Sequence, residues 1–394
     1  MKNKKVFLLE NIHPQGKKIF LENGYLEDEI FCAKGGLSNV ELEEILPYAE
    51  VLGIRSKTLI TEQHIKVATN LKAIGCFCIG TNQVNIKAAT QFGIAVFNAP
   101  YSNTRSVAEL VIGSMIMLIR RIPEKNQAVH QKVWAKDATN CREVRGKTLG
   151  IIGYGNIGIQ VGILAEALGV KVIYFDIETK LPFGNAQPAE SLIELVKKSD
   201  IISIHVPSTI LTKNLFNKEL ISQCKYGSIV INFSRGEVVD LNALKNAIQS
   251  QNIHGAAIDV YPFEPEKNGD IFECPLQNLK NVLLTPHIGG STEEAQENIS
   301  IDVSTKMINY VNKAVSLGSL TVPALQLPTI EGKQRIANIH HNEKGMLSAI
   351  NSILAQNDIN ILGQYLKTNE EIGYVVFDVD QKINKDIIEK MNAI

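Results

Sequence analysis

Short runs of β-branched and large apolar residues alternate with amphipathic stretches along most of this chain. Strands are predicted at Val6–Leu9, Val51–Ile54, Leu71–Cys76, Ile94–Phe97, Thr148–Ile152, Lys171–Phe175, Ile201–Val206, Ser228–Asn232, Gly255–Val260 and Val282–Leu284. Strands that alternate with helices are typical of βαβ units and parallel sheets. Because the alternation restarts near Gly146, the pattern predicts two α/β lobes.

Two long helices are predicted outside this alternation. The stretch Asn103–Gln131 connects the lobes, and its most apolar part is Leu110–Ile119. That part is half the length of about 20 residues that a membrane-crossing helix needs, so we expect a buried helix. A second helix is predicted to begin at Ser291, with Glu294 completing a capping box, and to continue to about Lys313.

The last part of the chain follows a segment without periodicity. Pro323, Pro328 and Gly332 interrupt this segment, and we interpret it as a linker. The residues after it, Arg335–Ile394, predict the order strand, helix, strand, strand, helix. The predicted fold class is therefore α/β, with two parallel-sheet domains and a small α+β module at the end.

Composition narrows the class of protein. The 394 residues include 40 Lys and Arg against 41 Asp and Glu, a formal charge of −1. Such a balance provides no electrostatic footprint for nucleic acid or an anionic membrane, so neither is expected as a partner. The N-terminal apolar stretch ends at Glu10, too short for a signal-peptide core, and we expect a cytoplasmic protein. Cys76 and Cys78 are the one close pair among six cysteines, which predicts reduced thiols and no metal site.

A glycine-rich turn lies between a predicted strand and a predicted helix. It contains Gly153, Gly155 and Gly158, and Asp176 ends the next strand 18 residues later. Glycines allow a tight turn and close backbone approach, and the helix N-terminus offers unpaired N–H groups to a pyrophosphate. Asp176 would accept hydrogen bonds from ribose hydroxyls and repel a 2′-phosphate, so NAD is the expected cofactor. The alternative is a structural turn with a surface aspartate.

Four charged residues, Arg55, Arg235, Glu264 and His287, follow predicted strands, at the sheet edge that faces the ligand crevice in open α/β folds. Arg235 offers a planar fork suited to a carboxylate. His287 can exchange a proton near neutral pH. Glu264 would accept the other ring N–H of His287 and raise the imidazole pKa. Each has an ordinary structural explanation when taken alone, and their convergence favours a catalytic triad.

A positive loop ends a strand of the first lobe. Arg55 and Lys57 flank Ser56, and Asn103 lies at the predicted hinge between the lobes. Two cations around a serine suit a phosphate or a second carboxylate on the substrate. The alternative interpretation is a pair of solvated loop charges.

Taken together, these motifs resemble the D-isomer-specific 2-hydroxyacid dehydrogenases. The resemblance is carried by the glycine-rich turn, Ser234-Arg235-Gly236, Asp259 to Glu264-Pro265, and Pro286-His287 before Gly289. Three further stretches are similar to a bacterial, serine-regulated group of that family which oxidises 3-phosphoglycerate: Gly53–Thr58, Ile79–Val84 and Asn98–Glu109. The resemblance covers nearly the whole chain.

The resemblance implies a role for each candidate site residue. Arg235 would bind the substrate carboxylate and carbonyl oxygen, His287 would take the C2 hydroxyl proton, and Glu264 would orient His287. Arg55, Ser56, Lys57 and Asn103 would hold the substrate's phosphate and carboxylate end, although Lys57 stands where an arginine is common. The residues implied to contact NAD are Gly153, Gly155, Asn156, Ile157, Gly158, Asp176, Phe233, Ser234, Arg235, Asp259, His287, Ile288, Gly289 and Gly290.

The resemblance also implies a domain organisation. Residues 1–103 and 292–326 would form a discontinuous substrate-binding domain, and residues 104–291 a Rossmann domain that binds NAD. Residues 334–394 resemble an ACT domain, a small ferredoxin-like module, in which His340, Asn342 and Asn360 match residues that bind L-serine. The usual basic residue and proline after Asn342 are replaced, and the sequence stops before the final ACT strand. A homodimer or homotetramer is implied.

The expected activity is oxidation of 3-phosphoglycerate to 3-phosphohydroxypyruvate, the first step of the phosphorylated route to L-serine. The resemblance also implies reduction of 2-oxoglutarate, whose second terminal anion would fit the same cations, and L-serine is the effector that it implies for feedback. Two alternatives remain open: a glyoxylate or hydroxypyruvate reductase, which needs no phosphate-binding cations, and an NAD-sensing protein similar to the dehydrogenase-like corepressors.

Overall fold

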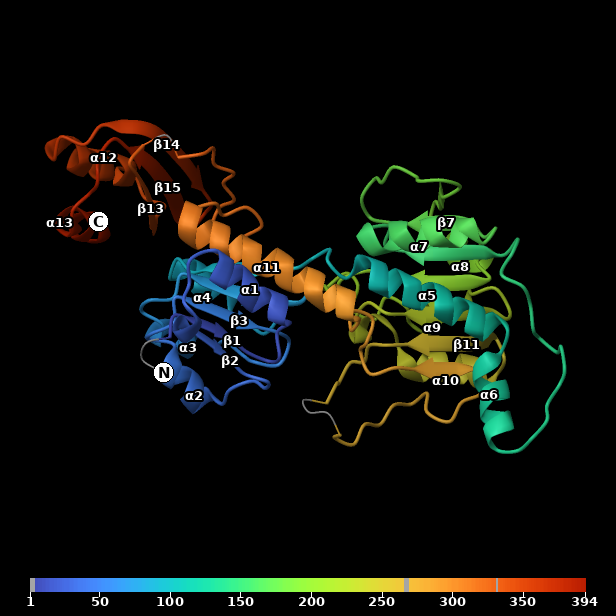
Figure 1. Ribbon diagram of the computed structural model, residues 1–394. Helices are drawn as coiled ribbons and strands as arrows, with labels where there is room; N and C mark the ends of the chain where they lie inside the picture. Colours follow the sequence, from blue (N-terminus) through green and yellow to red (C-terminus); the bar gives the residue numbers. More distant parts are fainter. Residues whose placement is uncertain (1–3, 266–268, 331) are drawn as a thin grey trace. The chain divides into compact units, whose positions relative to one another are not determined.

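The computed structural model describes residues 4–265, 269–330 and 332–394 (Figure 1). Within these ranges the strands form two parallel sheets, of five and seven strands, and one antiparallel sheet of three. The chain divides into two compact units. Unit 1 comprises Met1–Ser102 and Gln296–Ile394, and unit 2 comprises Asn103–Ala295. The predicted fold class, two parallel α/β sheets with a small α+β module, is confirmed.

The parallel sheet of unit 1 has the strand order β2-β1-β3-β4-β5, which is the flavodoxin-like order. Its strands are β1 (Val6–Leu8), β2 (Ile30–Cys32), β3 (Val51–Ile54), β4 (Ala73–Cys76) and β5 (Ala95–Asn98). The helical segments between them are α1 (Pro14–Glu22), η1 (Glu27–Glu29), α2 (Asn39–Ile45), α3 (Glu62–Val67) and α4 (Ile86–Gln91). The sequence pattern missed β2, a short strand in which Ile30 is the one buried residue.

The parallel sheet of unit 2 has the order β12-β11-β10-β9-β6-β7-β8, which contains the Rossmann arrangement. Its strands are β6 (Thr148–Ile152), β7 (Lys171–Phe175), β8 (Gln187–Pro188), β9 (Ile201–Ile204), β10 (Ser228–Asn232), β11 (Ile253–Ile258) and β12 (Val282–Leu284). The helical segments are α5 (Thr104–Ile119), α6 (Ile122–His130), α7 (Asn156–Ala167), α8 (Leu192–Lys198), α9 (Lys218–Ser222), η2 (Gly236–Val238) and α10 (Leu241–Gln249).

The helical stretch predicted for Asn103–Gln131 is two helices, α5 and α6. The backbone turns at Arg121, whose φ of 55° is left-handed. Pro123 lies two residues later, in the first turn of α6. Because a proline lacks an N–H and its ring clashes with the carbonyl four residues earlier, it permits a new helix to start and prevents the old one from continuing. The apolar part of α5 is buried in the core of unit 2, as its composition predicts, through side chains such as Val111, Met115 and Leu118.

Helix α11 (Glu293–Lys313) ends where the sequence predicts, but its cap is one residue later than expected. The hydroxyl of Thr292, rather than that of Ser291, accepts the N–H of Ala295 at 3.1 Å. Ser291 donates its own N–H to the carbonyl of Ile288 and so belongs to the preceding loop. None of the helices in the described ranges has both the length and the apolar character that a bilayer crossing requires.

The C-terminal module has the predicted order strand, helix, strand, strand, helix. These are β13 (Gln334–His341), α12 (Met346–Gln356), β14 (Ile361–Thr368), β15 (Ile372–Val379) and α13 (Lys385–Asn392), with β15 between the other two strands (Figure 1). Every residue of β15 is buried. One face of it, including Val375 and Phe377, packs with α12 and α13, whereas Tyr374 and Val376 join the core beneath the five-stranded sheet.

A buried ion pair connects this module to the rest of unit 1. Arg335 donates two hydrogen bonds to the carboxylate of Asp378, at 2.7 and 2.6 Å, and the side chains are 5% and 0% exposed. The same guanidinium donates to the carbonyls of Lys313, at the end of α11, and Pro328, in the linker. The pair therefore connects β13 and β15 with α11 and the linker.

Removal of one partner of this pair is expected to cost more than removal of both. Arg335→Met leaves the Asp378 carboxylate buried and unpaired, and it should lower the free energy of unfolding by about 3–5 kcal/mol. Arg335→Met combined with Asp378→Leu should recover most of that loss, because no buried charge remains. Urea unfolding followed by circular dichroism measures both. Lys385→Met, at an exposed ion pair with Glu389, is the control and should cost less than about 1 kcal/mol. Equal losses in the single and double variants would contradict this account.

Candidate active site

The glycine-rich turn leaves room for a ligand beside the start of α7. Gly153 has a φ of 91°, and a Cβ added there would lie 2.6 Å from the carbonyl oxygen of His205. A Cβ on Gly158 would collide with the carbonyl of Gly153, whereas one on Gly155 would meet nothing within 4 Å. Gly155 is the N-cap of α7 and supplies no capping side chain, so the first N–H groups, including those of Asn156 and Ile157, are open to an anion.

Asp176 follows β7 and lies against this turn. One carboxylate oxygen accepts the N–H of Tyr154 at 2.8 Å, and the other accepts the N–H of Glu178 at 2.9 Å. Each oxygen keeps a lone pair for a ligand hydroxyl. A cradle of glycines, an open helix N-terminus and a fixed carboxylate are what the pyrophosphate and ribose of NAD require, so these residues fit that cofactor.

The loop after β10 is shaped by Asn232, a buried residue that the sequence analysis did not select. Its side-chain oxygen accepts the N–H and the hydroxyl of Ser234, at 3.1 and 2.8 Å, and its amide donates to the carbonyl of Arg235 at 3.0 Å. Phe233 is buried beside it. The guanidinium of Arg235 donates to the carbonyl of Ser234 at 2.7 Å. The loop is therefore fixed before any substrate is present.

His287 and Glu264 form the predicted pair. The distance from His287 Nδ1 to Glu264 Oε2 is 2.7 Å, and the other oxygen of Glu264 accepts the N–H of Tyr261 at 3.1 Å. The hydrogen bond that His287 donates to Glu264 raises the pKa of His287 against the effect of burial. Burial by itself would raise the pKa of Glu264, but the hydrogen bond and charge of His287 outweigh it and lower that pKa. The His287 side chain is 51% exposed, which leaves its ring accessible to a substrate.

Asp259 holds the loop that carries His287. Its Oδ1 accepts the hydroxyl of Thr285 at 2.6 Å and the N–H of Ile288 at 2.8 Å, and its Oδ2 accepts the N–H of Gly289 at 2.8 Å. These bonds offset the left-handed backbone of His287, whose φ is 54°. The resemblance implies that Asp259 contacts the nucleotide. In this structure its hydrogen bonds are with the loop that carries His287.

Two further loop contacts were not evident from the sequence. Gly236 lies so close to the backbone of Tyr261 that a Cβ at this position would overlap it, and the hydroxyl of Tyr261 lies 3.0 Å from the carbonyl of Thr285. Asn103 is beside Gly290, since a Cβ on Gly290 would lie 2.5 Å from the Asn103 amide nitrogen. The structure thus brings Asn103, Arg235, Glu264 and His287 to loops of unit 2.

The remaining candidate substrate residues belong to unit 1. Arg55, Ser56 and Lys57 follow β3 at the carboxyl edge of the five-stranded sheet. Arg55 is half-buried, and Ser56 and Lys57 are exposed. Within the described residues their side chains form no hydrogen bond or ion pair, which leaves both cations available to an anionic ligand.

The three candidate effector residues are not brought together within one chain. His340 and Asn342 lie at the end of β13 that pairs with Gly373 and Ile372 of β15. Asn360 precedes β14 and exchanges hydrogen bonds with Asp380, beyond the other end of β15. Seven residues of extended strand separate the two ends, a distance of about 23 Å. Asn342 donates its side-chain amide to the carbonyl of Asn369.

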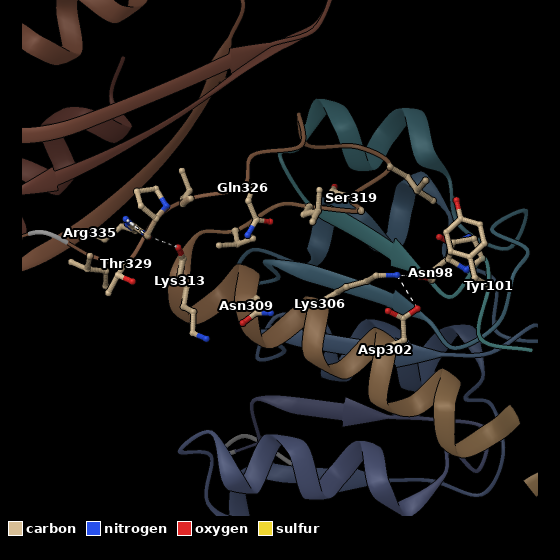
Figure 2. Close-up of a pocket in the computed structure, with 18 residues that line it drawn as sticks. Asn98, Tyr101, Asp302, Lys306, Asn309, Lys313, Ser319, Gln326, Thr329 and Arg335 are labelled. Atoms are coloured by element: carbon tan, nitrogen blue, oxygen red, sulfur yellow. Dashed lines mark hydrogen bonds and ion pairs between the residues drawn. The ribbon is translucent and has the colours of Figure 1, made fainter. Parts of the chain in front are cut away.

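A large pocket in unit 1 contains none of the candidate site residues (Figure 2). Its volume is about 1070 Å³, and it lies among α11, the β5–α5 connection, the linker and Arg335. Lys306 donates to the carbonyl of Asn98 and to Asp302, both at 2.9 Å, and Arg335 is held by Asp378. Since these charged groups already have partners, the pocket provides no free catalytic group at Lys306 or Arg335.

Comparison with known proteins gives matches over almost the whole chain. Residues 112–289 match the NAD-binding domain of the D-isomer specific 2-hydroxyacid dehydrogenases, and residues 336–394 match an ACT domain like that of the AHAS small subunit. The chain is 48% identical to D-3-phosphoglycerate dehydrogenase of Escherichia coli strain K12 over 392 residues, which cover 99% of this chain and 95% of the relative. It is 45% identical to the Dictyostelium discoideum enzyme of the same name over 390 residues, with the same coverage.

Solved structures share the fold of the two parallel-sheet regions. The D-lactate dehydrogenase of Aquifex aeolicus, complexed with NAD and lactic acid, aligns with a TM-score of 0.70 and 26% identity, over 81% of this chain and 100% of that one. The NAD-dependent formate dehydrogenase of Staphylococcus aureus, in complex with NAD, aligns with a TM-score of 0.65 and 27% identity, over 78% and 96%.

The charge of Glu264 predicts a shift in the titration of His287. We expect the pKa of His287 to lie above the ordinary value of 6.5 and to fall in Glu264→Gln, because the carboxylate that stabilises the imidazolium is then absent. NMR titration of the histidine rings measures this directly. His254 is the internal control: burial and the charges of Arg142 and Arg121 lower its pKa, and it should not respond. An unchanged His287 titration in the variant would contradict the prediction.

Proposed function

Since the chain belongs to the D-isomer-specific 2-hydroxyacid dehydrogenases, we propose that it oxidises 3-phospho-D-glycerate to 3-phosphohydroxypyruvate with NAD, the first step of the phosphorylated route to L-serine. The observation that carries the proposal is the match of 99% of the chain to 95% of the length of an enzyme with that activity in its name. The His287–Glu264 pair and the fit of the glycine-rich turn to NAD provide the required chemistry.

In the proposed mechanism the Arg235 guanidinium binds the substrate carboxylate and the oxygen on C2. His287 accepts the C2 hydroxyl proton at Nε2, because Nδ1 is held by Glu264. The Glu264 carboxylate stabilises the imidazolium that forms. NAD, when bound, supplies the acceptor for the hydride that leaves C2. In the reverse direction the imidazolium returns its proton to the same oxygen.

The proposed domain roles follow from this chemistry. We assign substrate binding to residues 1–103 and 292–326, NAD binding to residues 104–291 and regulation to residues 334–394. Arg55 and Lys57 would bind the substrate phosphate, which supports 3-phosphoglycerate over glyoxylate or hydroxypyruvate, since those acids carry no second anion. The same two cations would accept the second carboxylate of 2-oxoglutarate, so we propose its reduction as a side activity.

For regulation we propose that L-serine binds between two copies of the ACT-like module. His340 and Asn360 lie at opposite ends of β15, which are about 23 Å apart along the strand, and this supports the arrangement because a molecule as small as serine cannot contact both. A two-fold axis would bring His340 and Asn342 of one copy next to Asn360 of the other and create two equivalent sites. The protein would then be at least a homodimer, and we place it in the cytoplasm.

Loss of the His287 imidazole tests the mechanism. His287→Ala should lower kcat for 3-phosphoglycerate oxidation by a factor of about 10² or more, since general base catalysis is lost. NADH binding, measured by fluorescence, should remain close to that of the unmodified protein. His254→Ala, on the same unit, is the matched control and should keep its activity. Near-normal turnover by His287→Ala would rule out the mechanism, and no NADH formation by the unmodified protein would rule out the proposed activity.

Mixed oligomers test the shared serine site. His340→Ala and Asn360→Ala, each purified alone, should lose serine binding in calorimetry, because every site then lacks one side chain. Oligomers that contain one chain of each variant, isolated with two different affinity tags, should recover some sites, since one site in such a pair has all its residues intact. A site within a single chain would give no recovery.

A further inference from the structure

Two buried side chains hydrogen-bond the backbone of the Arg55–Thr58 loop of unit 1. Neither of them is among the residues predicted for the active site or the effector site. The loop runs from Arg55 to Thr58, between β3 and the bridge at Ile60. Its exposed part, Ser56 and Lys57, contrasts with Thr58, which is 4% exposed. The loop therefore consists of a solvent-facing half, which carries charge, and a buried half, which anchors it.

Glu10 binds the loop through two successive backbone amides. Its Oε2 accepts the N–H of Lys57 at 3.0 Å, and its Oε1 accepts the N–H of Thr58 at 2.8 Å. Glu10 is only 7% exposed, and its carboxylate forms no salt bridge with any other residue of the described ranges. Adjacent N–H groups that point the same way form a concave anion site, and in this loop the anion is a side chain of the protein itself.

Gln83 binds the same loop through a carbonyl. Its side-chain amide donates to the carbonyl of Arg55 at 2.5 Å and to that of Gly80 at 3.2 Å. Gln83 is also 7% exposed, and its own carbonyl accepts the N–H of Ile60. Glu10 thus accepts hydrogen bonds at one end of the loop, and Gln83 donates a hydrogen bond at the other end. A donor could not take the place of Glu10, and an acceptor could not take the place of Gln83.

The backbone around Glu10 is arranged to make this contact. Glu10 and Asn11 both adopt left-handed conformations, with φ of 60° and 54°. Their N–H groups donate to the carbonyls of Gly35 and Ala33, each at 2.9 Å. Two consecutive non-glycine residues in this region are strained, and such strain persists where surrounding bonds fix it, often beside functional loops.

We propose that Glu10 and Gln83 are positioning residues that fix the Arg55–Lys57 loop for binding of the substrate's phosphate end. The inference rests on the proposed function and extends it. Because Glu10 already occupies the amides of Lys57 and Thr58, those N–H groups are not available to the substrate. The phosphate is then held by the Arg55 and Lys57 side chains, whose direction depends on the loop backbone. The two buried side chains therefore act on substrate affinity without touching the substrate.

The test compares variants of the full-length protein. Glu10→Gln replaces one acceptor oxygen by an NH2 group, which would face a backbone N–H that needs an acceptor. Gln83→Leu removes the amide donor and keeps a side chain of similar size. Each should raise the KM for 3-phosphoglycerate by about ten- to a hundredfold, because misplaced binding groups lose affinity steeply. The value of kcat at saturation and the dissociation constant of NADH should stay near those of the unmodified protein. Glu50→Gln is the matched control, since Glu50 precedes β3 at its opposite end and pairs with Lys72.

A double-mutant cycle with Arg55→Ala separates this inference from the proposed function. On the Arg55→Ala background, Gln83→Leu should add much less to KM than it does alone, because Gln83 holds the Arg55 carbonyl and both changes act on the same contact. If Arg55→Ala leaves KM unchanged, the proposed phosphate contacts are wrong. If Arg55→Ala raises KM but Glu10→Gln and Gln83→Leu do not, or if Glu50→Gln raises it equally, the positioning role is wrong. Should Glu10→Gln fail to fold, Gln83→Leu carries the same test.

Discussion

Close backbone approach at the carboxyl edge of the seven-stranded sheet is the constraint on which the His287–Glu264 pair depends. Parallel strands end at one edge, but their loops diverge unless the backbones can touch. Gly236 permits this contact, since only a hydrogen in place of a Cβ fits against Tyr261. Tyr261 in turn donates its N–H to Glu264, so the glycine in one loop fixes the carboxylate in the next.

The two units solve the same physical problem in the same way. In each, a loop must hold a functional side chain in place without a regular element around it, and a left-handed backbone lies at His287 in one unit and at Glu10 and Asn11 in the other. In unit 2 the carboxylate of Asp259 accepts the successive N–H groups of Ile288 and Gly289, and in unit 1 Glu10 accepts those of Lys57 and Thr58. A buried carboxylate that receives charge-assisted hydrogen bonds is costly to leave unpaired, which makes each loop conformation specific.

The sequence predicts those features of the fold and the site that local chemistry determines, and it does not predict those that depend on contacts formed only in the folded chain. The glycine-rich turn, Asp176 and the His287–Glu264 pair were found because local chemistry determines them: a missing side chain, a charge or a titratable ring. Most strands of the parallel sheets were found because burial requires apolar runs, whereas β2 and β8, most of whose residues are not buried, were missed. Asn232 was missed, since its role depends on hydrogen bonds to backbone groups that the sequence does not display.

The register of the strands in the C-terminal sheet determines where the three candidate effector residues lie, and no local sequence pattern contains that information. His340, Asn342 and Asn360 are close in sequence, and they are placed at opposite ends of the sheet only by the antiparallel pairing with β15. That strand also shows why the module and the lobe beneath it form one unit. Its residues alternate between two cores, and Tyr374 bonds the carbonyl of Ala314 at 2.7 Å, directly after α11. Because close-packed interiors do not deform continuously, a shift of β15 on its helical face displaces its other face, and with it the end of α11.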